Sequence, residues 1–174
     1  MLLYNGRRME ESKDDISMRY VSTLLAVKDV NRSRQFYQEL FEQEVTMDFG
    51  RNVTFSGGFC IQQDFDWLAE FSKDSIKERS HNMELYFEVD DFDAFIDKLS
   101  SFENINYLHQ PKMHEWKQRV VRIYDPDYHI IEIGESMAVI AARYLKQGYS
   151  VEETAKIIQH PIEFVESVAK GSMS

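Results

Sequence analysis

The sequence predicts an α+β protein in which a βαβββ unit occurs twice and is followed by a helical tail. Three observations support this prediction. A strand, an acidic turn and an amphipathic helix occur twice in the same order, strand and turn patterns follow each helix, and the pattern becomes helical near the C-terminus. Val89 follows Val27 by 62 residues, and Asp91 follows Asp29 by the same interval. Such self-similarity indicates an internal duplication.

The first unit opens with residues 20–27 (YVSTLLAV), a short apolar run rich in strand-forming residues. A helix is predicted over residues 31–40, because three of its apolar side chains share one side of a helix. Either Asp29 or Asn31 can cap its start. Three further strands are predicted at residues 44–49, 52–55 and 59–62, with Ser56-Gly57-Gly58 turning the last two into a hairpin.

The second unit repeats this order. Residues 83–89 (MELYFEV) predict a strand, and residues 93–99 predict a helix with apolar residues at helical spacing. Strands are then predicted at residues 105–109, 119–124 and 129–133. The last two flank Asp125-Pro126-Asp127-Tyr128, a sequence typical of a tight turn.

These units predict a domain over residues 19–135, with modules at 19–64 and 82–135. Residues 1–18 are predicted to be a flexible extension, because Arg7 and Arg8 follow the short apolar start and a signal peptide has the reverse order. The connecting segment, residues 64–81, is predicted to form either a short helix on the sheet edge or a flap near a pocket. Residues 136–174 predict a helical tail, in which Ser150 and Glu153 fit a capping box.

Charge and composition exclude several classes of partner. The formal net charge is −10, and an acidic surface repels nucleic acid and anionic lipid. No apolar run approaches the about 20 residues that span a bilayer. Basic and acidic residues balance in the tail, which argues against DNA binding and for packing on the domain or on a second subunit. Cys60 is the single cysteine, which fits a reducing, cytoplasmic location.

Two segments carry a family resemblance. Val27-Lys28-Asp29-Val30 with Phe36-Tyr37 resembles the opening of the vicinal-oxygen-chelate superfamily, and Tyr124-Asp125-Pro126-Asp127 with Ile131-Glu132-Ile133 resembles its closing hairpin. That superfamily includes glyoxalase I, fosfomycin- and bleomycin-resistance proteins and extradiol dioxygenases. The resemblance covers residues 19–135. It implies a curved mixed sheet around a cavity, a small-molecule ligand and a homodimer. Tyr128 stands where the family turn usually carries glycine, and a side chain there resists positive φ.

The resemblance also implies four metal-ligand positions, one on each inner strand: Ser22, Gln62, Glu84 and Glu132. Alternation along the strands places the same residues on the inner face. The set has no imidazole and a poor ligand at Ser22, so it suits Mn or Mg better than Zn or Ni. Two inward carboxylates require compensation by a metal, a shared proton, or a cation such as Arg119 or Arg122. A divalent metal and a metal-free site both remain open.

Two functions follow from this resemblance. One is a lyase or isomerase acting beside a carbonyl group, with Glu84 and Glu132 as catalytic residues and a metal polarising the substrate. The other is a non-catalytic binder that sequesters a drug or metabolite. The residues predicted to contact the ligand are Tyr86, His114, Trp116, Gln118 and Arg122. Two simpler alternatives also remain: solvated glutamates on an open sheet, and a Trp116 that only anchors its loop.

Overall fold

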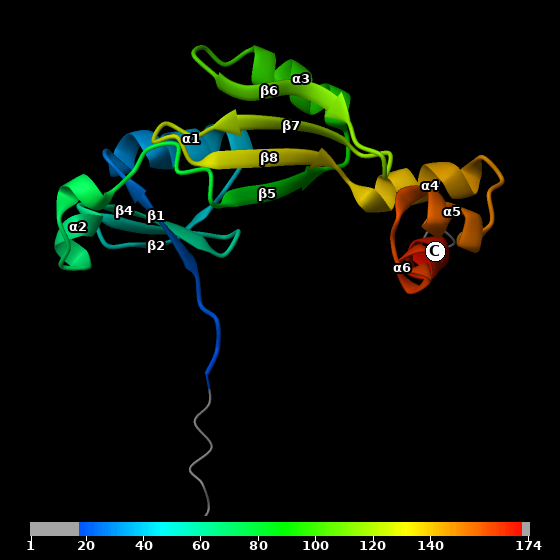
Figure 1. Cartoon of the computed structure of the whole chain (residues 1–174), viewed down its shortest axis with the longest axis horizontal. Helices are drawn as coiled ribbons and strands as arrows, with labels where there is room; N and C mark the ends of the chain where they lie inside the picture. The colour runs from blue at the N-terminus through cyan, green and yellow to red at the C-terminus, as the bar shows by residue number, and fades with distance from the viewer. Residues whose placement is uncertain (1–17, 172–174) are drawn as a thin grey trace, which may run out of the picture.

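The computed structural model describes residues 18–171 and confirms the α+β class and the duplicated unit (Figure 1). Most of the predicted N-terminal extension, residues 1–17, lies outside the described residues. The first module contains β1 (Thr23–Val27), α1 (Val30–Phe41), β2 (Val45–Asp48), β3 (Asn52–Phe55) and β4 (Phe59–Gln63). The second contains β5 (Glu84–Val89), α3 (Phe92–Ser100), β6 (Asn106–Met113), β7 (Arg119–Tyr124) and β8 (Ile130–Glu135).

Each module folds its strands into a sheet of its own. Sheet A has the order β1-β4-β3-β2, and sheet B has the order β5-β8-β7-β6. In both sheets the first strand pairs in parallel with the last, and the other pairs are antiparallel. The strands predicted to form one curved sheet are therefore divided between two sheets with the same topology.

The acidic residue after each first strand starts the helix that follows. Asp29 Oδ1 accepts hydrogen bonds from the backbone N of Asn31 and of Arg32, at 2.9 and 3.1 Å. Asp91 Oδ1 accepts a bond of 2.9 Å from the backbone N of Ala94. Of the two cap candidates in the first module, Asp29 is therefore the one that acts, and the duplication extends to its helix cap.

The two modules share one hydrophobic core. Leu25 and Ile61 from sheet A and Ile131 from sheet B are each no more than 1% exposed and belong to the same cluster. Across the junction, the rings of Phe41 in α1 and Phe87 in β5 stack with centroids 4.6 Å apart. The alternate residues of each strand are thereby turned away from this core.

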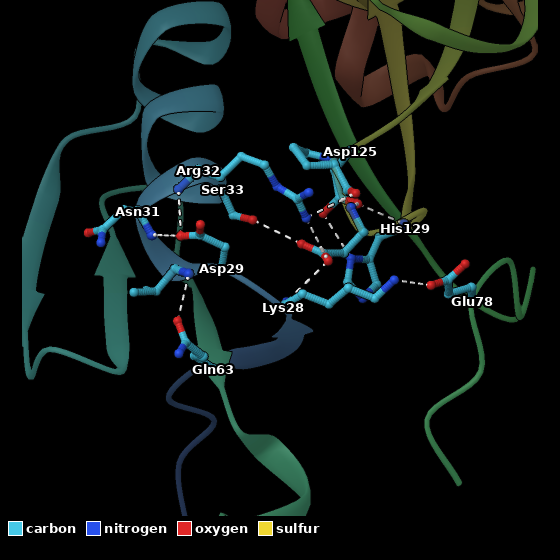
Figure 2. A network of polar contacts seen from close by, with 12 residues as sticks. Lys28, Asp29, Asn31, Arg32, Ser33, Gln63, Glu78, Asp125 and His129 are labelled. Atoms are coloured by element: carbon cyan, nitrogen blue, oxygen red, sulfur yellow. Dashed lines mark hydrogen bonds and ion pairs between the residues drawn. The ribbon is translucent and has the colours of Figure 1, made fainter. Parts of the chain in front are cut away.

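A turn of the second module is bound to the start of α1 in the first (Figure 2). Asp127, whose side chain is 3% exposed, accepts hydrogen bonds from the backbone N of Lys28, the guanidinium of Arg32 and the hydroxyl of Ser33, at 3.1, 2.9 and 3.0 Å. The neighbouring Tyr128 adopts φ 69°, so the turn keeps the left-handed conformation despite the side chain. The Asp-Pro-Asp motif thus joins the modules.

Asp125, in the same turn, has a fully buried carboxylate. It accepts hydrogen bonds of 2.8 Å from the Tyr37 hydroxyl and from Nδ1 of His129. Burial, together with the Asp125 charge, raises the pKa of Tyr37 well above its usual value. For His129, burial lowers the pKa, but the hydrogen bond and charge of Asp125 outweigh it, so the pKa is raised overall.

The tail is helical, and the connecting segment contains two short helical pieces. The connection contains the short helix α2 (Phe65–Leu68) and a 3₁₀ turn, η1 (Lys73–Ser75). The tail contains α4 (Met137–Lys146), α5 (Val151–Ile158) and α6 (Ile162–Gly171), and the predicted capping box of Ser150 and Glu153 is present. None of the helices between residues 18 and 171 is long and apolar enough to cross a membrane.

The tail has a separate core and lies at one end of the molecule (Figure 1). Ile140, Ile158 and Val165 are fully buried in it, and Trp116 from the loop before β7 packs against it. Arg143 of α4 also forms an ion pair with the buried Glu135 at the end of β8. These two contacts help to attach the tail to sheet B.

Candidate functional site

The inner face of sheet B carries a row of polar side chains on neighbouring strands. Leu85, Phe87 and Val89 of β5 contact the core, and the residues between them are exposed. The strand register places Tyr86 opposite Glu132 of β8, and Glu132 opposite Arg122 of β7. Because paired residues point to the same side of a sheet, these side chains gather on one surface.

Arg122 lies at the centre of this surface. Its Nε donates to Glu84 Oε2 at 3.0 Å, and its Nη2 forms an ion pair with Glu132. Its Nη1 donates to Nε2 of His109 at 3.2 Å. The side chains of Arg122 and Glu132 are 21% and 9% exposed, whereas Glu84 is 39% exposed. One guanidinium therefore compensates both inward carboxylates, which was one of the three predicted ways to stabilise them.

A second set of contacts joins the same face to the tail. Gln118 is 3% exposed, and its Nε2 donates to the Tyr86 hydroxyl at 2.7 Å and to the carbonyl of Glu135 at 3.0 Å. Trp116 Nε1 donates to Gln118 Oε1 at 2.9 Å, and Tyr86 donates to Glu88 at 2.7 Å. A continuous chain of hydrogen bonds thus runs from Trp116, against the tail, to an exposed carboxylate on β5.

Gly134 of β8 leaves the space that this chain needs. A Cβ at that position would lie 2.5 Å from Gln118 Nε2 and 3.1 Å from the Tyr86 hydroxyl. Any side chain there would push Gln118 away from its partners. The glycine therefore allows the close approach of a neighbouring side chain.

Two groups in this set have shifted pKa values. Burial raises the pKa of Tyr86 to about 12, the bond to Glu88 adds to the rise and the bond to Gln118 opposes it. His114 stacks on Trp116 with centroids 4.1 Å apart, and burial with nearby cations lowers its pKa. At neutral pH Tyr86 therefore keeps its proton, and the His114 imidazole is uncharged.

Of the other two predicted ligand positions, Gln62 lies in sheet A, whereas Ser22 lies just outside it and not on an inner strand as predicted. Ser22 precedes β1, and its hydroxyl donates to the backbone carbonyl of Thr23 at 3.1 Å. Gln62 in β4 is 4% exposed, and its Oε1 accepts a hydrogen bond from Asn52 at 3.0 Å. Among residues 18–171, no hydrogen bond or ion pair links either residue to the glutamates of sheet B. The predicted quartet is thus divided between the two modules, with Ser22 outside the strands.

The residues on sheet B do not fit a resident divalent metal. The guanidinium of Arg122 already bonds to both carboxylates, and it holds a positive charge at the place where a cation would bind them. Within the described part of the chain, no group of three or more histidine, cysteine, aspartate or glutamate side chains is arranged to hold a metal ion. The imidazole of His109 accepts a bond from the same arginine.

Sequence reasoning missed two residues of this face: His109 and Gly134. His109 meets Arg122 because the pairing of β6 with β7 shifts on either side of it. Such irregular pairing leaves no signal in the sequence pattern. Strand alternation also predicts Glu88 on the face of Glu84 and Tyr86, and its exposed side chain lies there.

The paired βαβββ units define the class of this protein, the vicinal-oxygen-chelate fold. The model of the Glyoxalase-like domain matches residues 20–138, so α5 and α6 lie beyond the match. A protein of unknown function from Agrobacterium tumefaciens str. C58 is 37% identical, with a TM-score of 0.60 over 69% of this chain and 95% of that one. The chain belongs to the glyoxalase-like family.

More distant structures share the fold alone. Lactoylglutathione lyase from Agrobacterium tumefaciens is 19% identical, with a TM-score of 0.53 over 70% of this chain and 96% of that one. The fosfomycin resistance protein FosX from Listeria monocytogenes is 21% identical, with a TM-score of 0.52 over 70% of this chain and 95% of that one. A search of curated protein sequences found no match.

Proposed function

We propose that this chain is a small-molecule-binding protein whose ligand lies on the inner face of sheet B and binds without a resident metal. The ion pairs of Arg122 with Glu84 and Glu132 are the observation that supports this proposal. The two carboxylates would otherwise need a divalent ion beside them. Arg122 neutralises their charge, so the face is already stable without a metal.

The free groups on this face favour a ligand that donates hydrogen bonds. Arg122 directs its nitrogens to Glu84, Glu132 and His109, so it has little left to offer. The accessible groups are the carboxylates of Glu84 and Glu88 beside the ring of Tyr86, which is 49% exposed. Carboxylates with an aromatic face suit a small amine, through ion pairing and a cation–π contact. Sequestration of such a drug or metabolite is the favoured function.

A second copy of the chain completes the site in this proposal. Met47 of β2 and Tyr86 of β5 are exposed large side chains, at 48% and 49%, and lie on different sheets. A ligand on one open sheet would remain largely hydrated, whereas small-molecule sites bury most of the ligand surface. We therefore expect a homodimer in which sheet A of one copy covers sheet B of the other. Cytoplasmic location stays a proposal, consistent with the free, buried Cys60.

Metal-free proton transfer is the second candidate function. Glu84 is the more exposed carboxylate and lies beside a guanidinium, 3.0 Å from Nε of Arg122. In such an isomerase of an α-hydroxycarbonyl compound, Glu84 would take a proton from the hydroxyl-bearing carbon and return it to the former carbonyl carbon, while the hydroxyl proton passes to the former carbonyl oxygen. Once Glu84 holds that proton, its bond to Arg122 weakens, and the freed Nε would stabilise the negative oxygen formed between the two steps. A metal-assisted lyase or dioxygenase reaction does not fit these ion pairs.

Metal analysis and ligand titration test these proposals together. Protein purified without chelators, as wild type and as Glu84→Gln with Glu132→Gln, is analysed for Mn, Mg, Zn and Ni. We expect no stoichiometric metal in either. Stoichiometric metal that the double variant loses would overturn the metal-free site.

Ligand binding is then measured by thermal shift with a panel of small primary amines. Glu84→Gln should abolish the shift, and Glu103→Gln, an exposed glutamate of the same module, should keep it. A shift that survives Glu84→Gln would place the ligand elsewhere. Deuterium exchange into a carbonyl substrate, lost in Glu84→Gln, would establish the isomerase instead.

A further inference from the structure

Two charged side chains on the inner face of sheet B are not part of an ion pair. Arg122 pairs with Glu84 and Glu132. Among residues 18–171, no ion pair is present for Glu88 of β5 or for Lys112 of β6, and both side chains are exposed. One negative and one positive group are therefore available to a bound molecule.

Glu88 and Lys112 lie at opposite ends of one row of residues across the sheet. Glu88 pairs with Gly134 of β8, and Gly134 pairs with Val120 of β7. Val120 in turn pairs with Lys112 of β6. Paired residues point to the same side of a sheet, so Lys112 shares the face of Glu88. β5 and β6 are the two edge strands (Figure 1), and three strand intervals of about 4.8 Å separate the two backbones by about 14 Å.

Basic side chains gather at the β6 edge of this face. Burial lowers the pKa of His114, and the nearby charges of Lys112, Arg122 and His109 lower it further. Both ring nitrogens of His109 are bonded: Nδ1 donates to a backbone carbonyl at 2.9 Å, and Nε2 accepts from Arg122 at 3.2 Å. β6 contains no acidic residue, and Glu115 lies beyond its end. Lys112 is therefore the cation at this edge that can bind an anionic group.

We propose that the ligand of this face is an extended amino carboxylate, with its amine at Glu84 and Glu88 and its carboxylate at the ammonium of Lys112. This inference rests on the amine site proposed above and adds an anionic end to the ligand. Because the side chains at both edges can lean inward, the two charged groups of the ligand lie closer together than the about 14 Å between the backbones.

The middle of the face suits an uncharged chain between these two ends. Arg122 and Glu132 form an ion pair there, so their charges cancel. The ring of Tyr86 is 49% exposed and offers an apolar surface to methylene groups. Gln118 fills the space above Gly134, so the chain of the ligand passes beside Gln118. A linear alkyl chain fits these neighbours.

The test compares 8-aminooctanoate with 8-aminooctanamide, which has the same chain and the same amine but no negative charge. Isothermal calorimetry with the full chain measures both affinities at constant ionic strength. The carboxylate should bind about threefold more tightly, which corresponds to one exposed ion pair. 4-Aminobutyrate is too short to reach both edges, so it should bind no more tightly than its own amide.

Substitutions of Lys112 locate the anionic end. Lys112→Gln should make the affinities for 8-aminooctanoate and its amide equal. Lys112→Glu should reverse the preference, so that 1,8-diaminooctane binds more tightly than 8-aminooctanoate. Lys146→Gln removes the same charge from an exposed position of the tail and should keep the preference of the wild type for the carboxylate.

The outcomes separate this inference from the proposed amine site. If the wild type binds 8-aminooctanoate and its amide equally, and Glu84→Gln loses both, the anionic end is wrong and the amine site stands. If neither compound binds saturably, both proposals are wrong. If Lys112→Gln and Lys146→Gln reduce the preference for the carboxylate equally, the preference is a general effect of charge, and the role of Lys112 is refuted.

Discussion

Arg122→Met should destabilise the protein by about 3 kcal/mol. The methionine keeps most of the aliphatic volume of Arg122 and removes the charge that both Glu84 and Glu132 face. Removing one partner of a buried ion pair costs about 3–5 kcal/mol, because the other charge is left buried and unpaired. Arg122 is 21% exposed, so water can reach it and the low end applies.

The two carboxylates contribute unequally to the destabilisation expected for Arg122→Met. Glu132 is 9% exposed and accounts for most of it, whereas Glu84 is 39% exposed and adds less than about 1 kcal/mol. Adding Glu132→Gln to the Arg122→Met chain removes the unpaired buried charge. The double variant should therefore be less destabilised than the sum of the single variants, by about 2 kcal/mol.

Urea unfolding of the wild type, both single variants and the double variant measures the coupling between the two substitutions. At about 2–4 °C per kcal/mol, Arg122→Met should also lower Tm by about 6–12 °C. Arg51→Met is the control, because Arg51 and Asp64 form a pair that is 60% and 40% exposed. It should cost less than about 1 kcal/mol. A coupling near zero, or equal costs for the two arginines, would refute the role of Arg122.

Two further predictions follow from Gly134 and His129. Gly134→Ala should cost about 1–3 kcal/mol in urea unfolding and disrupt the bond from Gln118 to Tyr86, because its Cβ would lie 2.5 Å from Gln118 Nε2. An unchanged free energy of unfolding would show that Gln118 moves aside freely. The folded-state pKa of His129 is raised above its unfolded value of about 6.5, so its stabilising contribution is complete below that pH and is lost as pH rises through the folded pKa. The free energy of unfolding of the wild type should therefore fall relative to that of His129→Gln as pH rises from about 6.5 through the folded pKa. A difference between the two proteins that stays constant over this pH range would contradict the prediction.

Local patterns in the sequence determined the architecture of this protein. The interval between the two strand, turn and helix segments indicated the duplication, and the acidic residues after each first strand act as the helix caps. Strand alternation placed Leu85 and Phe87 toward the core and Glu84 and Tyr86 on the opposite face. These features depend on neighbours along the chain or on a period of two, so the sequence contains them.

Only the tertiary structure decided what the polar residues do. Whether Arg122 or a metal compensates Glu84 and Glu132 depends on the register between β7 and β8, which brings Arg122 opposite Glu132. Trp116, predicted to contact a ligand or anchor its loop, packs on the tail because that core lies beside sheet B.

The division of the ligand positions has the same origin. Gln62 belongs to one sheet and the two glutamates to the other, because each module pairs its own strands. Such contacts join residues far apart in the chain, and no local pattern specifies them.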